Sequence, residues 1–324
     1  EDAVSAKVTR STLTGADRLQ VRATNASRII SSAITAGLGG NGLAGSFVIN
    51  RVTPTTNAAI SGLSGTLATI SVSGDAVVLA DGSRIGVYDD IIRGRQAVSA
   101  ANRSEVDFSG AAANEGTAIA EGAAVLAIVG ALQGGDNNVG VSVLSNTIAQ
   151  SHIAAIDFAT VTADGDVSVV ARDGATLTGI AVGLGIATGQ FAGVASVAHQ
   201  TIDNVIRARI SGGSITSRDV AVQAQAASEI AGRAGTLAGS TGTAAVGLSI
   251  VDSSIANDVA AGISGTQIRA SGDVVLAAGS TATIDTVAIG LAMARNVGLA
   301  GSVANNNVAT DIGATITGAD IIAG

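Results

Sequence analysis

The sequence repeats itself at intervals of about 50 residues, a spacing typical of repeat architectures. Five nine-residue segments open with Val or Ile, carry Ala at the sixth step and close with Ile at the eighth. Because each unit of a repeat array forms the same local structure and stacks on its neighbours, this self-similarity predicts a repetitive fold. The five copies are Val52–Ile60, Ile148–Ile156, Ile202–Ile210, Ile255–Ile263 and Val308–Ile316, and two weaker copies are Val4–Thr12 and Val98–Val106.

A second anchor follows most copies, in which an Asp at a turn precedes an alternating strand. In Val167-Ser168-Val169 and Val220-Ala221-Val222, β-branched residues alternate with small ones, which is the period of an extended chain. With 43 Gly in the chain, stable helices are disfavoured, although a short helix within Ala113–Ala131 stays open. The anchors stand at Asp17, Asp75, Asp166, Asp219, Asp273 and Asp320.

These patterns predict an all-β fold, a parallel β-helix or solenoid that runs continuously over residues 1–324. A unit of about 50 residues is long for one coil, so we expect two coils of roughly 25 residues, such as Asp166–Ala192 and Gly193–Arg218. About 13 coils at ~4.8 Å each would form a rod on the order of 60 Å long. Both ends fall inside repeat units, which favours a segment of a longer array or end-to-end pairing of copies. An Asn ladder inside the rod has five candidates: Asn50, Asn146, Asn204, Asn257 and Asn307.

Composition excludes several classes of partner. The net charge is −8, and Lys7 is the only lysine, so neither nucleic acid nor an anionic membrane surface is expected to bind. Gly174–Ile202 carries no formal charge and could span a bilayer by length. It is interspersed with Gly, Ser and Thr, however, so we interpret it as buried strands and expect no membrane insertion. The chain has no Cys, and therefore neither disulfides nor thiolate metal sites.

No motif indicates catalysis or a cofactor. Gly40–Gly45 matches G-x-G-x-x-G, but the residues after it predict a strand, whereas a dinucleotide site needs a helix there. His152 and His199 are the only histidines and are too isolated to predict a zinc site. Asp136, Asp164 and Asp166 are weak candidates for calcium ligands, although capping of tight turns is the favoured interpretation.

The segment Asp81–Gly110 is the most charged and least typical part of the chain. It predicts either an excursion from the array or a degenerate repeat. A carbohydrate-active enzyme on a β-helix would need clustered carboxylates and aromatic platforms, and only this segment offers them. A solvated loop is the simpler interpretation. The candidate interaction residues are Tyr88, Asp89, Asp90, Arg93 and Arg95.

Together, the two anchors and the long Ala/Gly/Val stretch after them resemble the repeats of filamentous haemagglutinin-like and leukotoxin-like filamentous adhesins. These are very large bacterial exoproteins, and Ile255–Ala294 is the most similar stretch. The resemblance implies a right-handed β-helix, secretion to the bacterial cell surface and a role in attachment or biofilm, with no catalytic residues.

The expected function is therefore a structural rod or stalk segment of a surface adhesin. A self-assembling extracellular fibre or sheath subunit is the first alternative, and a carbohydrate-active enzyme is the second. The expected partners are a host or cell-surface ligand, or neighbouring copies of the chain end to end, with no cofactor.

Overall fold

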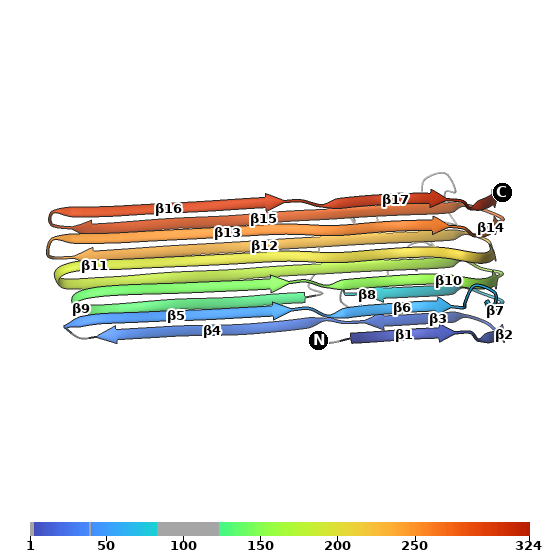
Figure 1. Cartoon of the computed structure of the whole chain (residues 1–324), viewed down its shortest axis with the longest axis horizontal. Helices are drawn as coiled ribbons and strands as arrows, with labels where there is room; N and C mark the ends of the chain where they lie inside the picture. Colours follow the sequence, from blue (N-terminus) through green and yellow to red (C-terminus); the bar gives the residue numbers. More distant parts are fainter. Residues whose placement is uncertain (1–2, 39, 83–122) are drawn as a thin grey trace.

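The structure is a computed structural model that describes residues 3–38, 40–82 and 123–324 (Figure 1). These residues form 18 strands and no helix, and the named strands pair in parallel, which confirms the all-β prediction. In this part of the chain no helix is long and apolar enough to cross a membrane. The strands are β1 Ala3–Thr9, β2 Thr12–Ala16, β3 Leu19–Thr24, β4 Ser27–Leu38, β5 Asn41–Val52, β6 Thr55–Ser61, β7 Ala68–Val72, β8 Ala76–Asp81, β9 Ala123–Ile148, β10 Ser151–Ala163, β11 Val167–Ser217, β12 Val220–Ser240, β13 Ala244–Ser264, β14 Gln267–Ala270, β15 Val274–Ala294, β16 Val297–Val308, β17 Asp311–Thr317 and β18 Asp320–Ala323.

Most strands pair with the strand that lies about one repeat unit further along the chain, whereas pairs such as Val52 and Ile148 lie about two units apart. Val167 pairs with Val220, and Val220 pairs in turn with Val274. We call the stretch of chain from one residue to the position before its partner in the next strand, such as Val167 to Asp219, a layer. The prediction of two short coils in each unit is wrong, because Val167–Ala187 pairs with Val220–Ser240 and not with the residues directly after it. One repeat unit forms one layer.

The five predicted copies lie in register. Val52, Ile148, Ile202, Ile255 and Val308 form one column across the sheet, and the Ala and Ile of each copy form two more. The weak copy at Val4 was misplaced by four residues, because Val4 pairs with Thr56 and not with Val52. Val98 lies outside the described residues, and no strand separates Val52 from Ile148, since these two pair directly.

The stack is lower than the sequence suggested. The Ala column is six strands deep, from Ala6 to Ala314, so at ~4.8 Å per step its first and last strands lie about 24 Å apart. Both the expected number of coils and the expected length of the stack are therefore wrong. The longest axis follows the strands (Figure 1): the stretch Phe191 to Ile210 alone extends about 65 Å at ~3.3 Å per residue.

One end of every layer belongs to a three-sided body. In the second layer β6, β7 and β8 direct Ile60, Ile70 and Val78 onto one core, and all three side chains are fully buried. The equivalent residues of the next layers, among them Ile156, join the same cluster. Stacked Ile, Val and Ala side chains therefore fill the body, as expected for a β-helix core.

From the body the chain runs out and back as a two-walled arm, at the left in Figure 1. The outgoing wall consists of Ser27–Leu38, residues 123–135, Ala175–Ala187, Ser228–Ser240 and Ala282–Ala294. The return wall consists of Asn41–Val52, Asn137–Ile148, Phe191–Ile202, Ala244–Ile255 and Val297–Val308. Leu177 and Ile202 pack in one cluster near the body, and Ala187 and Ala192 pack in another near the tip, so the arm has a core of its own that becomes smaller outward.

The second layer contains a long connection between body and arm. Asp81 pairs with Thr24 of the first layer and with Arg172 of the third, and Ala123 pairs with Ser27 and with Ala175. In the first and third layers these paired positions are three residues apart. In the second layer the chain from Asp81 to Ala123 is far longer than in either neighbour. The segment Asp81–Gly110, predicted as an excursion or a degenerate repeat, lies outside the described residues after Gly82, and that prediction stays open.

A column of left-handed residues forms one corner of the body. Gly212, Gly265 and Gly318 have φ values of 63°, 55° and 58°, and Phe158 shares their column with φ 50°. Glycine adopts this conformation without a Cβ penalty, whereas other residues are strained in it. The glycines at this position of the repeat thus avoid the strain that the corner imposes on a residue such as Phe158.

Gly265→Ala is expected to lower the free energy of unfolding by about 1 kcal/mol, because a Cβ is disfavoured at positive φ. Space is not the reason, since no atom lies within 4 Å of the added Cβ. Gly279 is the matched control: it also has open space, but it lies in β15 and has no positive φ. Urea unfolding should show Gly279→Ala unchanged or slightly stabilised, and equal losses in both variants would contradict the assignment.

Candidate functional site

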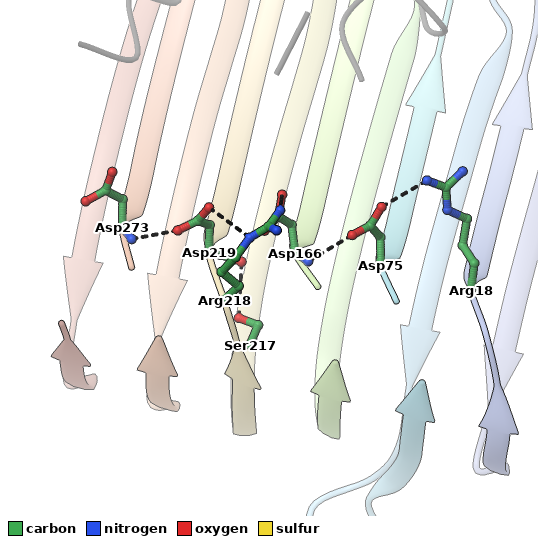
Figure 2. Close-up of polar contacts among 7 residues, drawn as sticks. All are labelled: Arg18, Asp75, Asp166, Ser217, Arg218, Asp219 and Asp273. Atoms are coloured by element: carbon green, nitrogen blue, oxygen red, sulfur yellow. Dashed lines mark hydrogen bonds and ion pairs between the residues drawn. The ribbon is translucent and has the colours of Figure 1, made fainter. Parts of the chain in front are cut away.

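The most regular polar feature of the described residues lies at the corner that precedes β8 and its equivalents (Figure 2). Arg18, Asp75, Asp166, Asp219 and Asp273 directly precede residues that share one column, so they stand above one another in successive layers. We call this set the Asp corner. Four of the six predicted second anchors supply its carboxylates.

Carboxylates of the Asp corner accept backbone hydrogen bonds from the next layer. The Asp166 backbone N–H donates to Asp75 Oδ1 at 3.0 Å, and the Asp273 N–H donates to Asp219 Oδ1 at 2.8 Å. Backbone bonds continue the ladder, as where Val167 N–H donates to Asp219 O at 2.9 Å. Each of these side chains therefore satisfies an amide that the turn leaves outside the strand ladder.

The glycine before Asp leaves room for this contact. A Cβ on Gly165 would collide with Asp75 Oδ1, and one on Gly272 would collide with Asp219 Oδ1. The Gly-Asp dipeptide is thus explained as one device: Gly lets the neighbouring layer's carboxylate approach, and Asp offers the same carboxylate to the layer after it.

Arginines bridge the same carboxylates. Arg18 Nη2 lies 2.9 Å from Asp75 Oδ2, and Arg218 binds Asp166 through Nε and Nη2, both at 3.0 Å. Hydrogen bonding to Asp166, followed by the attraction of its charge, raises the pKa of Arg218 above its ordinary value. The pairs are half exposed on the arginine side, so each contributes modestly, about 0–1 kcal/mol.

The calcium candidates are not brought together. Asp166 is bound to Arg218 in the Asp corner, whereas Asp136 lies on the tip side of the arm, where its Oδ1 accepts a hydrogen bond from Thr188 at 3.0 Å. Asp164 follows β10, and its backbone N–H donates to Val72 O. Among the described residues, no three His, Asp or Glu side chains form a group that could hold a metal ion.

Other ion pairs also join one layer to the next. Arg209 binds Asp157 at 2.7 Å, and Arg207 and Arg233 pair with Asp258 and Asp285. His199 Nδ1 lies 2.9 Å from Asp252 Oδ2 on the exposed face of the return wall. The partners of each pair lie about one repeat unit apart in the sequence, so these charged residues join neighbouring layers.

His152 belongs to a buried polar cluster that the sequence did not predict. Its column neighbours are Thr56 and Ile206, as the aligned copies predict, and the ring is fully buried. Its Nε2 hydrogen-bonds to Gln150 Oε1 at 2.8 Å and lies 3.1 Å from Asp173 Oδ1. Asn204 donates to the other oxygen of Asp173. Gln150 lies between β9 and β10, and Asp173 and Asn204 lie 31 residues apart in β11, so only the register of the layers could have shown the cluster. We interpret it as a hydrogen-bond network inside the junction of body and arm.

The predicted Asn ladder divides into two columns. Asn50 Nδ2 donates to Asn146 Oδ1 at 2.9 Å, and this column continues through Gln200 and Ser253. Asn204 and Asn257 form a second column four residues on, whereas Asn307 lies in the column of Ser254. A ladder that sequence analysis missed consists of serine alone: Ser46, Ser142, Ser196, Ser249 and Ser302.

Two further sequence predictions have clear outcomes. β5 begins at Asn41, within Gly40–Gly45, so a strand follows that motif, as expected. The Ala-rich stretch is strand from Ala123 onward. The candidate interaction residues Tyr88, Asp89, Asp90, Arg93 and Arg95 lie outside the described residues and stay predictions.

Comparison with known proteins adds no relative: no protein-family model, no curated protein and no solved structure matches this chain.

Replacing Asp219 tests the Asp corner. Asp219→Ala removes the acceptor of the Asp273 N–H and should cost about 1 kcal/mol of unfolding free energy, as loss of a capping side chain does. Asp219→Asn keeps an acceptor oxygen and should retain most of the stability. Asp203→Ala, an exposed carboxylate outside the corner, is the control and should stay within about 0.5 kcal/mol of the parent in urea unfolding. A loss as large in the control would refute the role of the corner.

Proposed function

We propose that this chain is a structural segment of a secreted bacterial surface protein, in which stacked layers give a stiff rod or stalk. One observation carries the proposal: parallel pairing recurs at every repeat unit with the same residues in register, as in the column Ile156, Ile210 and Ile263. Such stacking produces length and stiffness, because every layer satisfies the backbone of the next.

Two further features support the rod. The ion pairs of the Asp corner, of the return wall and of the body join adjacent layers, so side chains reinforce the same direction that the backbone ladder does. The resemblance of the repeats to filamentous haemagglutinin-like and leukotoxin-like adhesins favours a right-handed β-helix at the cell surface. A host or cell-surface ligand, or the next copy of the chain, is then the proposed partner.

A second candidate is a self-assembling fibre or sheath subunit. In the core column, a side chain between two layers is buried, whereas one with a layer on a single side is not: Ile210 is 0% and Ile263 1% exposed, and Ile316 is 52% exposed. A further layer stacked on β17 would cover it, and in a fibre that layer would come from a second copy of the chain. The carbohydrate-active alternative depends on Tyr88, Asp89 and Asp90, outside the described residues, and gains no support from the structure.

Electron microscopy of the purified protein over a concentration series distinguishes rod segment from fibre subunit. For a rod segment, the described layers should measure about 24 Å along the stack at every concentration, plus whatever the remaining residues add. Growth along the stack with concentration would instead establish the fibre subunit. A particle without layers spaced by ~4.8 Å would refute both.

Immunogold labelling tests the location. Antibodies against the purified chain should label the outside of intact cells of the source organism, because a stalk segment must project beyond the envelope. The matched sample is permeabilised cells, which report protein inside. Label that appears only after permeabilisation would overturn the surface assignment while leaving the rod architecture untouched.

A further inference from the structure

The arm reverses the usual distribution of side chains along a single strand. Near the body, β13 directs Ile255 inward and Asp258 outward, as a soluble sheet should. Near the tip the same strand directs Gly247 and Ser249 inward, while Leu248 and Ile250 stand outside and are 45% and 41% exposed. Both belong to a layer with neighbours above and below, so their exposure is not an effect of the end layers.

The interior of the arm near its tip has no room for these side chains. A Cβ on Gly247 would lie 2.6 Å from Leu291 O in the opposite wall. Ser249 donates across the walls to Ile289 O at 2.6 Å, and Ser142 donates to Val182 O at 2.7 Å. The serine column therefore ties two closely spaced backbones together, and the large apolar residues are left on the outer surface.

The outer surface of the return wall near the tip is continuous and uncharged. We call it the return face. Its proximal boundary is polar, at the pair His199–Asp252 and at Asn305, which donates to Asp252 at 2.8 Å. The return face consists of the outward residues Asn41, Leu43, Gly45, Phe47, Asn137, Val139, Val141, Val143, Phe191, Gly193, Ala195, Val197, Ala244, Val246, Leu248, Ile250, Val297, Leu299, Gly301 and Val303.

We propose that the return face packs against the return face of a second copy of this chain, so that rods associate side by side. With each of its five strands covering ~4.8 Å, the face measures about 23 Å by about 24 Å, or about 550 Å² on each copy. A pair would bury about 1,100 Å², just above the ~1,000 Å² that a specific interface needs. Flat apolar sheets pack well in this way, about 10 Å apart.

The absence of charge on the return face favours a second copy as its partner. Identical faces repel each other when they carry charge, and this face carries none although the chain has a net charge of −8.

Sedimentation velocity of the purified chain over a concentration series tests the pairing. The parent should form a dimer. Leu248→Glu should raise the dissociation constant of this dimer at least tenfold, because a charge would be buried within the interface. Ser254→Glu adds the same charge to the same strand beyond the polar boundary, and it should leave the dissociation constant unchanged. Both positions point outward, and equal thermal midpoints would show that both variants stay folded.

Crosslinking identifies the face that pairs. The chain has no Cys, so Ile250→Cys places a single thiol on the return face, and a short bis-maleimide should join two copies through it. Ser254→Cys is the control and should stay monomeric. A parent that is monomeric at all concentrations, or an association that Leu248→Glu leaves intact, overturns the proposal. Association that Leu248→Glu leaves intact would be stacking of copies end to end and not pairing of return faces. Binding of the parent, but not of Leu248→Glu, to neutral phosphatidylcholine vesicles without dimer formation would assign the face to lipid instead.

Discussion

Parallel backbone pairing between residues one repeat unit apart is the constraint on which the rest of the structure depends. Once Val167 lies beside Val220, every following residue of the layer has a fixed neighbour, and a residue type that repeats in sequence becomes a column in space. The Ile and Ala columns fill the body, the serine column ties the arm, and the Asp corner joins turns. A substitution in one layer therefore acts first on the two layers beside it, because each layer contacts only its neighbours.

The sequence predicted the columns better than it predicted the layers. Ile202, Ala208 and Ile210 were placed correctly because a nine-residue motif with period two leaves one register. The coil length was wrong because the unit folds out and back: both walls of the arm alternate small and apolar residues, so nothing local separates one long excursion from two short coils. Asp320 shows the same limit. It matches the Asp anchor in sequence but pairs with Gln267, in the column of Ser214, since register and not residue type decides the neighbour.

The polar sites show what one sequence can and cannot reveal. Asp75, Asp166 and Asp219 follow turn residues at a fixed place in the unit, so their shared corner was predictable, whereas their acceptance of the next layer's N–H was not. The cluster around His152 unites residues that are far apart in the sequence, and each alone is an ordinary polar residue in or beside a strand. Since buried polar groups are costly without partners, such a cluster fixes the junction of body and arm to one arrangement.

The space between the walls explains why the body buries its large apolar side chains and the arm exposes them. Three walls around the body leave space for Ile and Val, so burial there is internal and the outside can be charged, as at Arg209 and Asp157. Two walls that approach closely at Gly247 and Gly290 leave almost none, so the arm places its apolar residues outside. The uncharged segment Gly174–Ile202 was interpreted as buried strand, and this holds for one face only, because Val182 and Ile186 are 44% and 53% exposed. A wall that is apolar on its outer face gains stability only when something covers that face, and a second copy with the same uncharged surface is the partner that we propose for it.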